Sequence, residues 1–195
     1  MRIVLAKLLL LSKTTLLMKH FFLIFALALL FTLNGCDDGD IIITSFDFDE
    51  IAIEQCGDVG QFVFFKINSS NFESLSLQLT TQDSILNSVI TKNYPLNTTS
   101  NVINYRTFNE SITSAYFCSA IPPITPRVNA NFVSTQGTAS IVTTAVFLET
   151  GSGIPTDSII AYSTLITLQN IRLESETETI TQETLVFGTI RTPAN

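Results

Sequence analysis

Strict alternation of apolar and polar side chains is the feature that most constrains the fold of this chain. The stretch "SLSLQLT" places Leu75, Leu77 and Leu79 at every second position, with polar residues between them. Because successive side chains of a β-strand point to opposite faces of a sheet, the pattern predicts a strand with one apolar face. The preceding stretch "QFVFFKI", residues 61–67, has apolar side chains at odd and at even positions, so both faces of the strand would be apolar. This pattern predicts a central strand of a sheet.

Similar segments recur along the chain, and turn residues separate them. Strands are expected at 41–48, 50–55, 61–67, 74–80, 101–108, 112–120, 128–134, 139–149, 158–173 and 178–191. No segment of comparable length has the 3.6-residue period of an amphipathic helix. About nine strands joined by short turns predict an all-β fold, a two-layer antiparallel β-sandwich that forms a single domain over residues 41–195.

An immunoglobulin-like topology is an alternative within this fold class. In "AYFC", Tyr116 precedes Cys118 by two residues, which resembles the tyrosine corner of immunoglobulin domains. However, the chain has no tryptophan to pack on a disulfide, and several strands are expected after Cys118 where an immunoglobulin domain has one.

The N-terminal part of the chain has the layout of an export signal. Lys13 and Lys19 precede the uncharged stretch "FFLIFALALLFTL", residues 21–33. This stretch is too short to cross about 30 Å of hydrocarbon as a helix, and a basic region before a short apolar one is typical of a secretory signal. We therefore expect residues 1–35 to be a signal peptide. Met18 is the favoured start, which would make residues 1–17 an upstream extension, and Met1 is the alternative.

The signal ends in Leu33-Asn34-Gly35-Cys36, which resembles the lipobox of bacterial lipoproteins. The resemblance implies cleavage before Cys36, a diacylglycerol linked to its sulfur and an acyl chain on its amine. At about 0.8 kcal/mol per buried methylene, two or three acyl chains hold a protein on a bilayer. The alternative is a transmembrane stub that carries an unrelated cysteine.

Three acids, Asp37, Asp38 and Asp40, follow this cysteine and predict a solvated tether over residues 36–40. The start "CDDGD" resembles that of uncharacterised Bacteroidota-type outer-membrane lipoproteins, in which such acids promote export to the cell surface. In the enterobacterial scheme an aspartate after the cysteine implies retention at the inner membrane instead. We expect an outer-membrane, cell-surface location, with a periplasm-facing location as the alternative. The spacing of an EF-hand calcium loop is absent.

Charge and histidine content exclude several functions for the segment after Cys36. It contains six of the ten basic residues and all seventeen acids, so it repels phosphate backbones and is not expected to bind nucleic acid. The single histidine, His20, lies in the expected signal peptide. Ser-His-Asp and Cys-His catalysis and histidine zinc sites are therefore excluded. We expect no enzymatic activity and no cofactor.

Two cysteines remain beyond the lipidation site, Cys56 and Cys118. In an oxidising compartment an even pair favours a disulfide bond. Two separately buried thiols are the alternative.

Three glutamates in "LESETETI", Glu174, Glu176 and Glu178, are expected on one side of a strand, about 7 Å apart. Carboxylates on one strand cannot flank a glycosidic bond from opposite faces, so a glycosidase pair would need a partner from another strand. The favoured interpretation is a solvated face or a charged edge that blocks aggregation, and a cation site is the alternative.

The triplet "DSI" occurs at residues 83–85 and 157–159. It resembles the Asp-Ser/Thr-apolar acceptor site of Bacteroidota periplasmic O-glycosylation, which implies sugars on Ser84 and Ser158. Chance recurrence of three residues is the alternative.

Together these features predict a lipid-anchored extracytoplasmic protein whose β domain has a non-catalytic role in binding, adhesion or envelope organisation. Its expected partners are the membrane, through acyl chains on Cys36, and a glycan or protein ligand. Two other functions stay open: a carbohydrate-active enzyme with an unidentified Asp/Glu pair, and a structural subunit of an envelope complex.

Overall fold

The computed structural model describes residues 48–121, 123–149, 153 and 155–194. The signal segment, the tether with Cys36, Asp37, Asp38 and Asp40, and all but Phe48 of the strand expected at 41–48 lie outside these residues. The described part belongs to one compact unit, Asp40–Asn195. Its elements are β1 (Glu54–Asp58), β2 (Gln61–Asn68), β3 (Glu73–Leu79), β4 (Ile90–Pro95), β5 (Asn101–Phe108), α2 (Ala115–Cys118), β6 (Val128–Glu149), β7 (Pro155–Glu174) and β8 (Thr179–Pro193).

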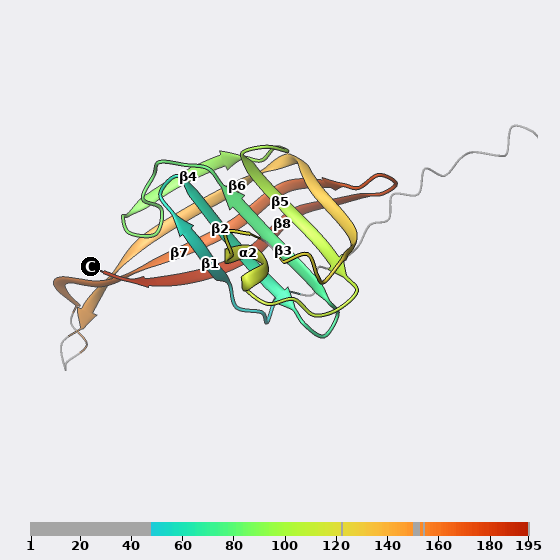
Figure 1. The fold of residues 1–195 in the computed structure, drawn as a ribbon. Helices are drawn as coiled ribbons and strands as arrows, with labels where there is room; N and C mark the ends of the chain where they lie inside the picture. The colour runs from blue at the N-terminus through green and yellow to red at the C-terminus, as the bar shows by residue number, and fades with distance from the viewer. Residues whose placement is uncertain (1–47, 122, 150–152, 154, 195) are drawn as a thin grey trace, which may run out of the picture. The chain divides into compact units, whose positions relative to one another are not determined.

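The predicted all-β antiparallel fold is confirmed. Eight strands of the described chain form one sheet in the order β1-β2-β3-β5-β6-β7-β8, and β4 pairs with β6 beside β5. Figure 1 shows the shorter strands β1, β2, β3 and β5 running obliquely across the long strands β6, β7 and β8. The sandwich-like arrangement therefore comes from one curled sheet whose two halves face each other.

The inner faces of both halves share one apolar core. Leu75, Leu77 and Leu79 lie on one face of β3, as the alternation predicts, and each is 1% exposed or less. The same core contains Ile166 and Leu168 of β7. The two halves approach closely at Gly188 of β8. If this residue had a Cβ atom, that atom would lie 2.9 Å from Ile53 Cδ1 and 3.7 Å from Lys66 Cε.

Residues 128–149 form one strand, so the predicted break at "TQGT" is wrong. Register shifts between Ser134 and Thr138 absorb the turn residues as bulges. Gly137 has φ +131°, and a Cβ atom on it would lie 3.0 Å from Ile171 Cα. The glycine therefore lets β6 bend closely over β7 instead of ending it.

Three other expectations about the strands are wrong: one boundary, one strand that was missed and one that is absent. Strand β1 begins at Glu54 rather than Glu50, because the backbone turns at Phe48, whose carbonyl accepts a hydrogen bond from Ile51 N. Strand β4 is not among the expected strands. It ends at Pro95 and pairs only with β6, a position in which a sheet tolerates proline. The expected strand 112–120 is replaced by helix α2.

Helix α2 packs on the outer side of the sheet against β1, β2 and β5. Phe117 stacks on Phe65 with ring centroids 4.5 Å apart, and Tyr116 meets Phe108 edge to face at 5.1 Å. Cys118 is bonded to Cys56 of β1, which confirms the predicted disulfide. Packing of these half-buried aromatic rings on distant strands outweighs the local strand pattern. The tyrosine-corner interpretation is therefore wrong, because Tyr116 and Cys118 lie in a helix.

Removal of the disulfide is expected to destabilise this domain. The bond closes a loop with a sequence separation of 62 residues, which corresponds to about 4 kcal/mol of chain entropy in the unfolded state. The Cys56→Ala/Cys118→Ala variant should lose about that free energy of unfolding in urea titrations. Reductant should have the same effect on the wild type and none on the variant. Unchanged stability of fully reduced protein would contradict this prediction.

Candidate functional site

The segment between β3 and β4, residues 80–89, closes one side of the curled sheet. Ile85 is fully buried and Leu86 is 5% exposed. The carbonyl of Ile85 accepts hydrogen bonds from Thr143 Oγ1 of β6 at 2.6 Å and Thr164 Oγ1 of β7 at 3.3 Å. The carbonyl of Leu86 accepts one from Thr192 Oγ1 of β8 at 2.5 Å. Three long strands thus hold the segment against the core.

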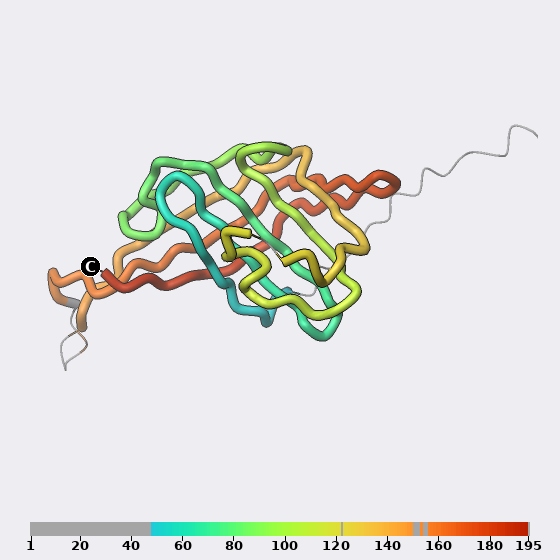
Figure 2. Tube along the Cα trace, viewed as in Figure 1, coloured from blue at the N-terminus to red at the C-terminus, as the bar shows by residue number. Residues whose placement is uncertain are grey.

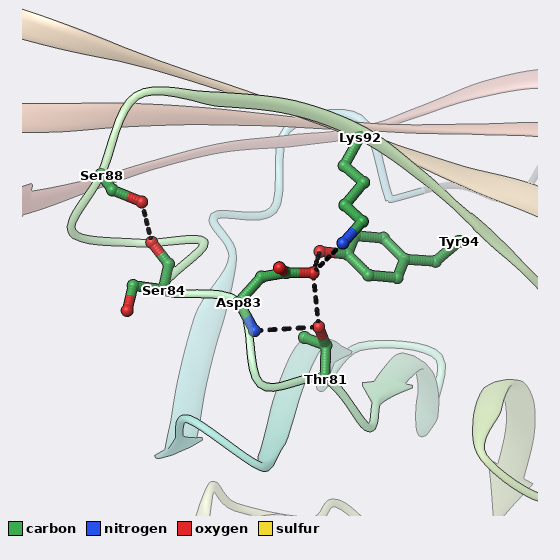
Figure 3. A network of polar contacts seen from close by, with 6 residues as sticks. All are labelled: Thr81, Asp83, Ser84, Ser88, Lys92 and Tyr94. Atoms are coloured by element: carbon green, nitrogen blue, oxygen red, sulfur yellow. Dashed lines mark hydrogen bonds and ion pairs between the residues drawn. The ribbon is translucent and has the colours of Figure 1, made fainter.

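The Asp83 carboxylate fastens the outer side of the same segment to β4 (Figure 3). Its Oδ2 atom accepts hydrogen bonds from Lys92 Nζ at 2.6 Å, Thr81 Oγ1 at 2.8 Å and Tyr94 OH at 2.8 Å. The hydrogen bond from Lys92, with those from Thr81 and Tyr94, lowers the pKa of Asp83 to about 2. Burial raises the pKa of Tyr94 to about 12, so its hydroxyl stays protonated and donates. The carboxylate therefore stays ionised at neutral pH and is not poised as a general acid. We call Asp83 with its partners Thr81, Lys92 and Tyr94 the Asp83 clamp.

Ser84 directly follows Asp83 in the chain, so the hydrogen bonds of Asp83 fix the backbone beside it. It is exposed and lies between the fixed Asp83 and the buried Ile85, and in Figure 3 its side chain points away from the Asp83 carboxylate. The second triplet differs, since Asp157, Ser158 and Ile159 of β7 are all exposed. Both serines predicted to carry sugars are therefore accessible. Ser84 lies in the segment between β3 and β4, and Ser158 lies in β7.

The three glutamates do not share one side of a strand, and that prediction is wrong. Glu174 ends β7 and forms an ion pair with Arg172 Nε at 2.6 Å. Glu176 and Glu178 belong to the turn before β8, which Ser175 shapes by accepting the backbone N–H of Glu178 at 3.0 Å. Serine favours such turns through this type of side-chain hydrogen bond. Within the described ranges, no three His, Cys, Asp or Glu side chains are arranged to hold a metal ion.

A groove of about 490 Å³ lies between this turn and the start of β6. Its lining includes Asn129, Asn131 and Phe132 of β6 and Glu176 and Glu178 of the turn. The sequence interpretation placed these segments on separate strands and did not bring them together.

Exposed apolar side chains gather at the end of the β6–β7 hairpin. Phe147 and Leu148 of β6 are 42% and 49% exposed, and Ile159 and Ile160 of β7 are 39% and 41% exposed. Phe147 lies opposite Ile159 in the register. We call these four residues the hairpin end.

The hairpin end projects because its neighbours are shorter. Pairing of β4 with β6 stops at Thr143, and pairing of β8 with β7 stops at Ala161. The trace in Figure 2 shows the hairpin continuing past the C-terminal end of β8. Sequence analysis missed this surface because it predicted both segments as strands without knowing which strands would flank them.

No family model, curated protein or solved structure matches the chain. Over the described residues, none of the helices has the length and apolar character needed to cross a membrane.

The Asp83 clamp predicts a defined acid dependence of stability. Because the folded pKa of about 2 lies below the unfolded value of about 3.9, ionised Asp83 stabilises the fold above about pH 4, and the effect disappears as the pH falls through about 2. The difference in Tm between wild type and Asp83→Asn should be constant near neutral pH and shrink between about pH 4 and 2.

The matched control is Asp157→Asn, which alters the exposed aspartate of the second triplet. It should change Tm little at any pH. A Tm difference for Asp83→Asn that persists undiminished at the acidic end would show that the carboxylate does not act through its charge.

Proposed function

We propose that the protein is a lipid-anchored lipoprotein of the outer membrane, displayed at the cell surface, and that its β domain acts by non-catalytic binding. The support for the anchor is the order of features in the sequence: a basic region, a short apolar segment and the run Leu33-Asn34-Gly35-Cys36. The support for export is the disulfide between the two remaining cysteines, since such bonds persist in oxidising compartments.

The hairpin end is the observation that carries the binding role. Four large apolar side chains lie exposed on two strands that extend beyond their neighbours. Large apolar side chains exposed together at one end of a hairpin are typical of contact sites. Glu149 and Asp157 flank it and are exposed, and charges there disfavour insertion into lipid. The partner is therefore a protein of the envelope with an apolar surface, which joins the binding and envelope-organising functions in one site.

The anchor is tested by protease treatment of intact cells, with mass spectrometry of the released peptides and of the Cys36 terminus. The expected result is release of domain peptides from intact cells and a diacylglycerol-modified Cys36. The Cys36→Ser variant should leave the membrane fraction, while its disulfide-bonded domain stays folded. An unmodified Cys36 would refute the anchor, and protection until the envelope is broken would place the domain on the periplasmic side.

The binding role is tested by cross-linking in intact cells with the variant Phe147→Thr/Ile159→Thr. Threonine keeps the strand propensity and removes the apolar contact, so the cross-linked complexes should disappear while Tm stays within a few degrees. The matched control is Leu165→Thr/Val186→Thr, which changes two exposed apolar residues in the middle of β7 and β8. Complexes that survive the hairpin variant, or that vanish equally in the control, would contradict this site.

A further inference from the structure

The start of β6 has an open edge within the described chain. On one side, β5 pairs with it from Val128 to Val133. On the other side, pairing with β7 ends where Val133 lies opposite Glu174, so residues 128–132 have no described strand beside them. A strand edge without a neighbour presents main-chain N–H and C=O groups that can pair with an added strand.

This open edge lies in the groove described above rather than on a flat surface. The β7–β8 turn, residues 175–178, forms the opposite wall, and the space between is about 490 Å³. Phe132 is 4% exposed and supports the groove from the core, whereas Asn129 and Asn131 are exposed along the edge. The groove therefore has room for an extended segment at the position that a continuation of β7 would occupy.

The charges of the groove indicate what such a segment carries. Glu176 and Glu178 are exposed on the turn, and no lysine or arginine of the described residues forms an ion pair with them. The nearby Arg106 donates from Nε to Asn131 Oδ1 at 2.7 Å, and Arg172 pairs with Glu174. Two unpaired carboxylates facing an open strand edge favour cationic side chains on the incoming strand.

We propose that this groove binds an extended, basic segment of a partner protein by strand addition to the open edge of β6. Main-chain hydrogen bonds to residues 128–132 supply affinity, and Glu176 and Glu178 select lysine or arginine at alternate positions of the segment. The site lies at the opposite end of β6 from the hairpin end, so it goes beyond the binding role proposed above and does not depend on it.

The test uses the full-length protein purified in detergent and a fluorescein-labelled peptide of alternating lysine and valine, read by fluorescence anisotropy. We expect saturable binding that weakens as salt is raised. The Glu176→Gln/Glu178→Gln variant should bind about tenfold more weakly, as expected for the loss of two exposed ion pairs. The control variant Glu149→Gln/Asp157→Asn removes the same charge at the hairpin end and should bind like the wild type.

Two further measurements separate strand addition from attraction between opposite charges. A peptide N-methylated on alternate residues keeps the charge but cannot donate along the edge, so it should not bind. Hydrogen exchange at residues 128–132 should slow when the unmodified peptide is added, and exchange at β4 should not change. Equal binding of the N-methylated peptide, equal weakening in both carboxylate variants, absence of saturable binding, or protection elsewhere would each overturn the proposal. Because the assay is done with purified protein, its failure would leave the cellular tests of the anchor and hairpin end unaffected.

Discussion

Hydrogen bonds from three threonine hydroxyls to the carbonyls of Ile85 and Leu86 hold the curled sheet closed on one side. Thr143 and Thr164 are 1% and 0% exposed, and their hydroxyl oxygens lie 2.9 Å apart. Each hydroxyl has one proton and lies within hydrogen-bond distance of both the Ile85 carbonyl and the other hydroxyl, so both buried hydroxyls are satisfied. An unmade bond here would leave a buried polar group without a partner, which costs more than a bond gains. The segment 80–89 is therefore fixed in one position over the core.

The Asp83 clamp depends on this arrangement. With Ile85 buried, the chain leaves the core at Ser84, and Asp83 lies where Lys92 and Tyr94 of β4 can reach it. The side chains of Lys92 and Asp83 are 50% and 30% exposed, so solvent weakens their attraction. The geometry comes from packing, and the charges then reinforce it. This order explains how the cluster of ionisable groups comes to connect the segment to β4.

Individual strands could be predicted from the sequence better than the segments whose structure depends on contacts with distant strands. Residues 101–108 were predicted with the bounds that β5 has, and the alternation at Leu75, Leu77 and Leu79 identified the inner face of β3. Both depend on local periodicity. Helix α2 could not be predicted in this way, because Tyr116 and Phe117 are placed by rings on distant strands. The same holds for Glu176 and Glu178, whose position in a turn depends on the point where β7 stops pairing with β6.

Unequal strand lengths connect both proposed contact sites. Strand β6 has 22 residues, and its neighbours cover different parts of it, so each end lacks a described partner on one side. At one end the unpaired part faces the acidic β7–β8 turn across a groove; at the other end it is apolar and projects. The adjoining part of β7 begins with Pro155, which has no N–H to donate, and Asp157 follows, and both features discourage strand addition along that edge. Between Val128 and Phe132, by contrast, there is no proline and no charged residue. One edge is therefore protected against strand addition and the other is open. Such a sheet can add a strand at one place and avoid aggregation at the other.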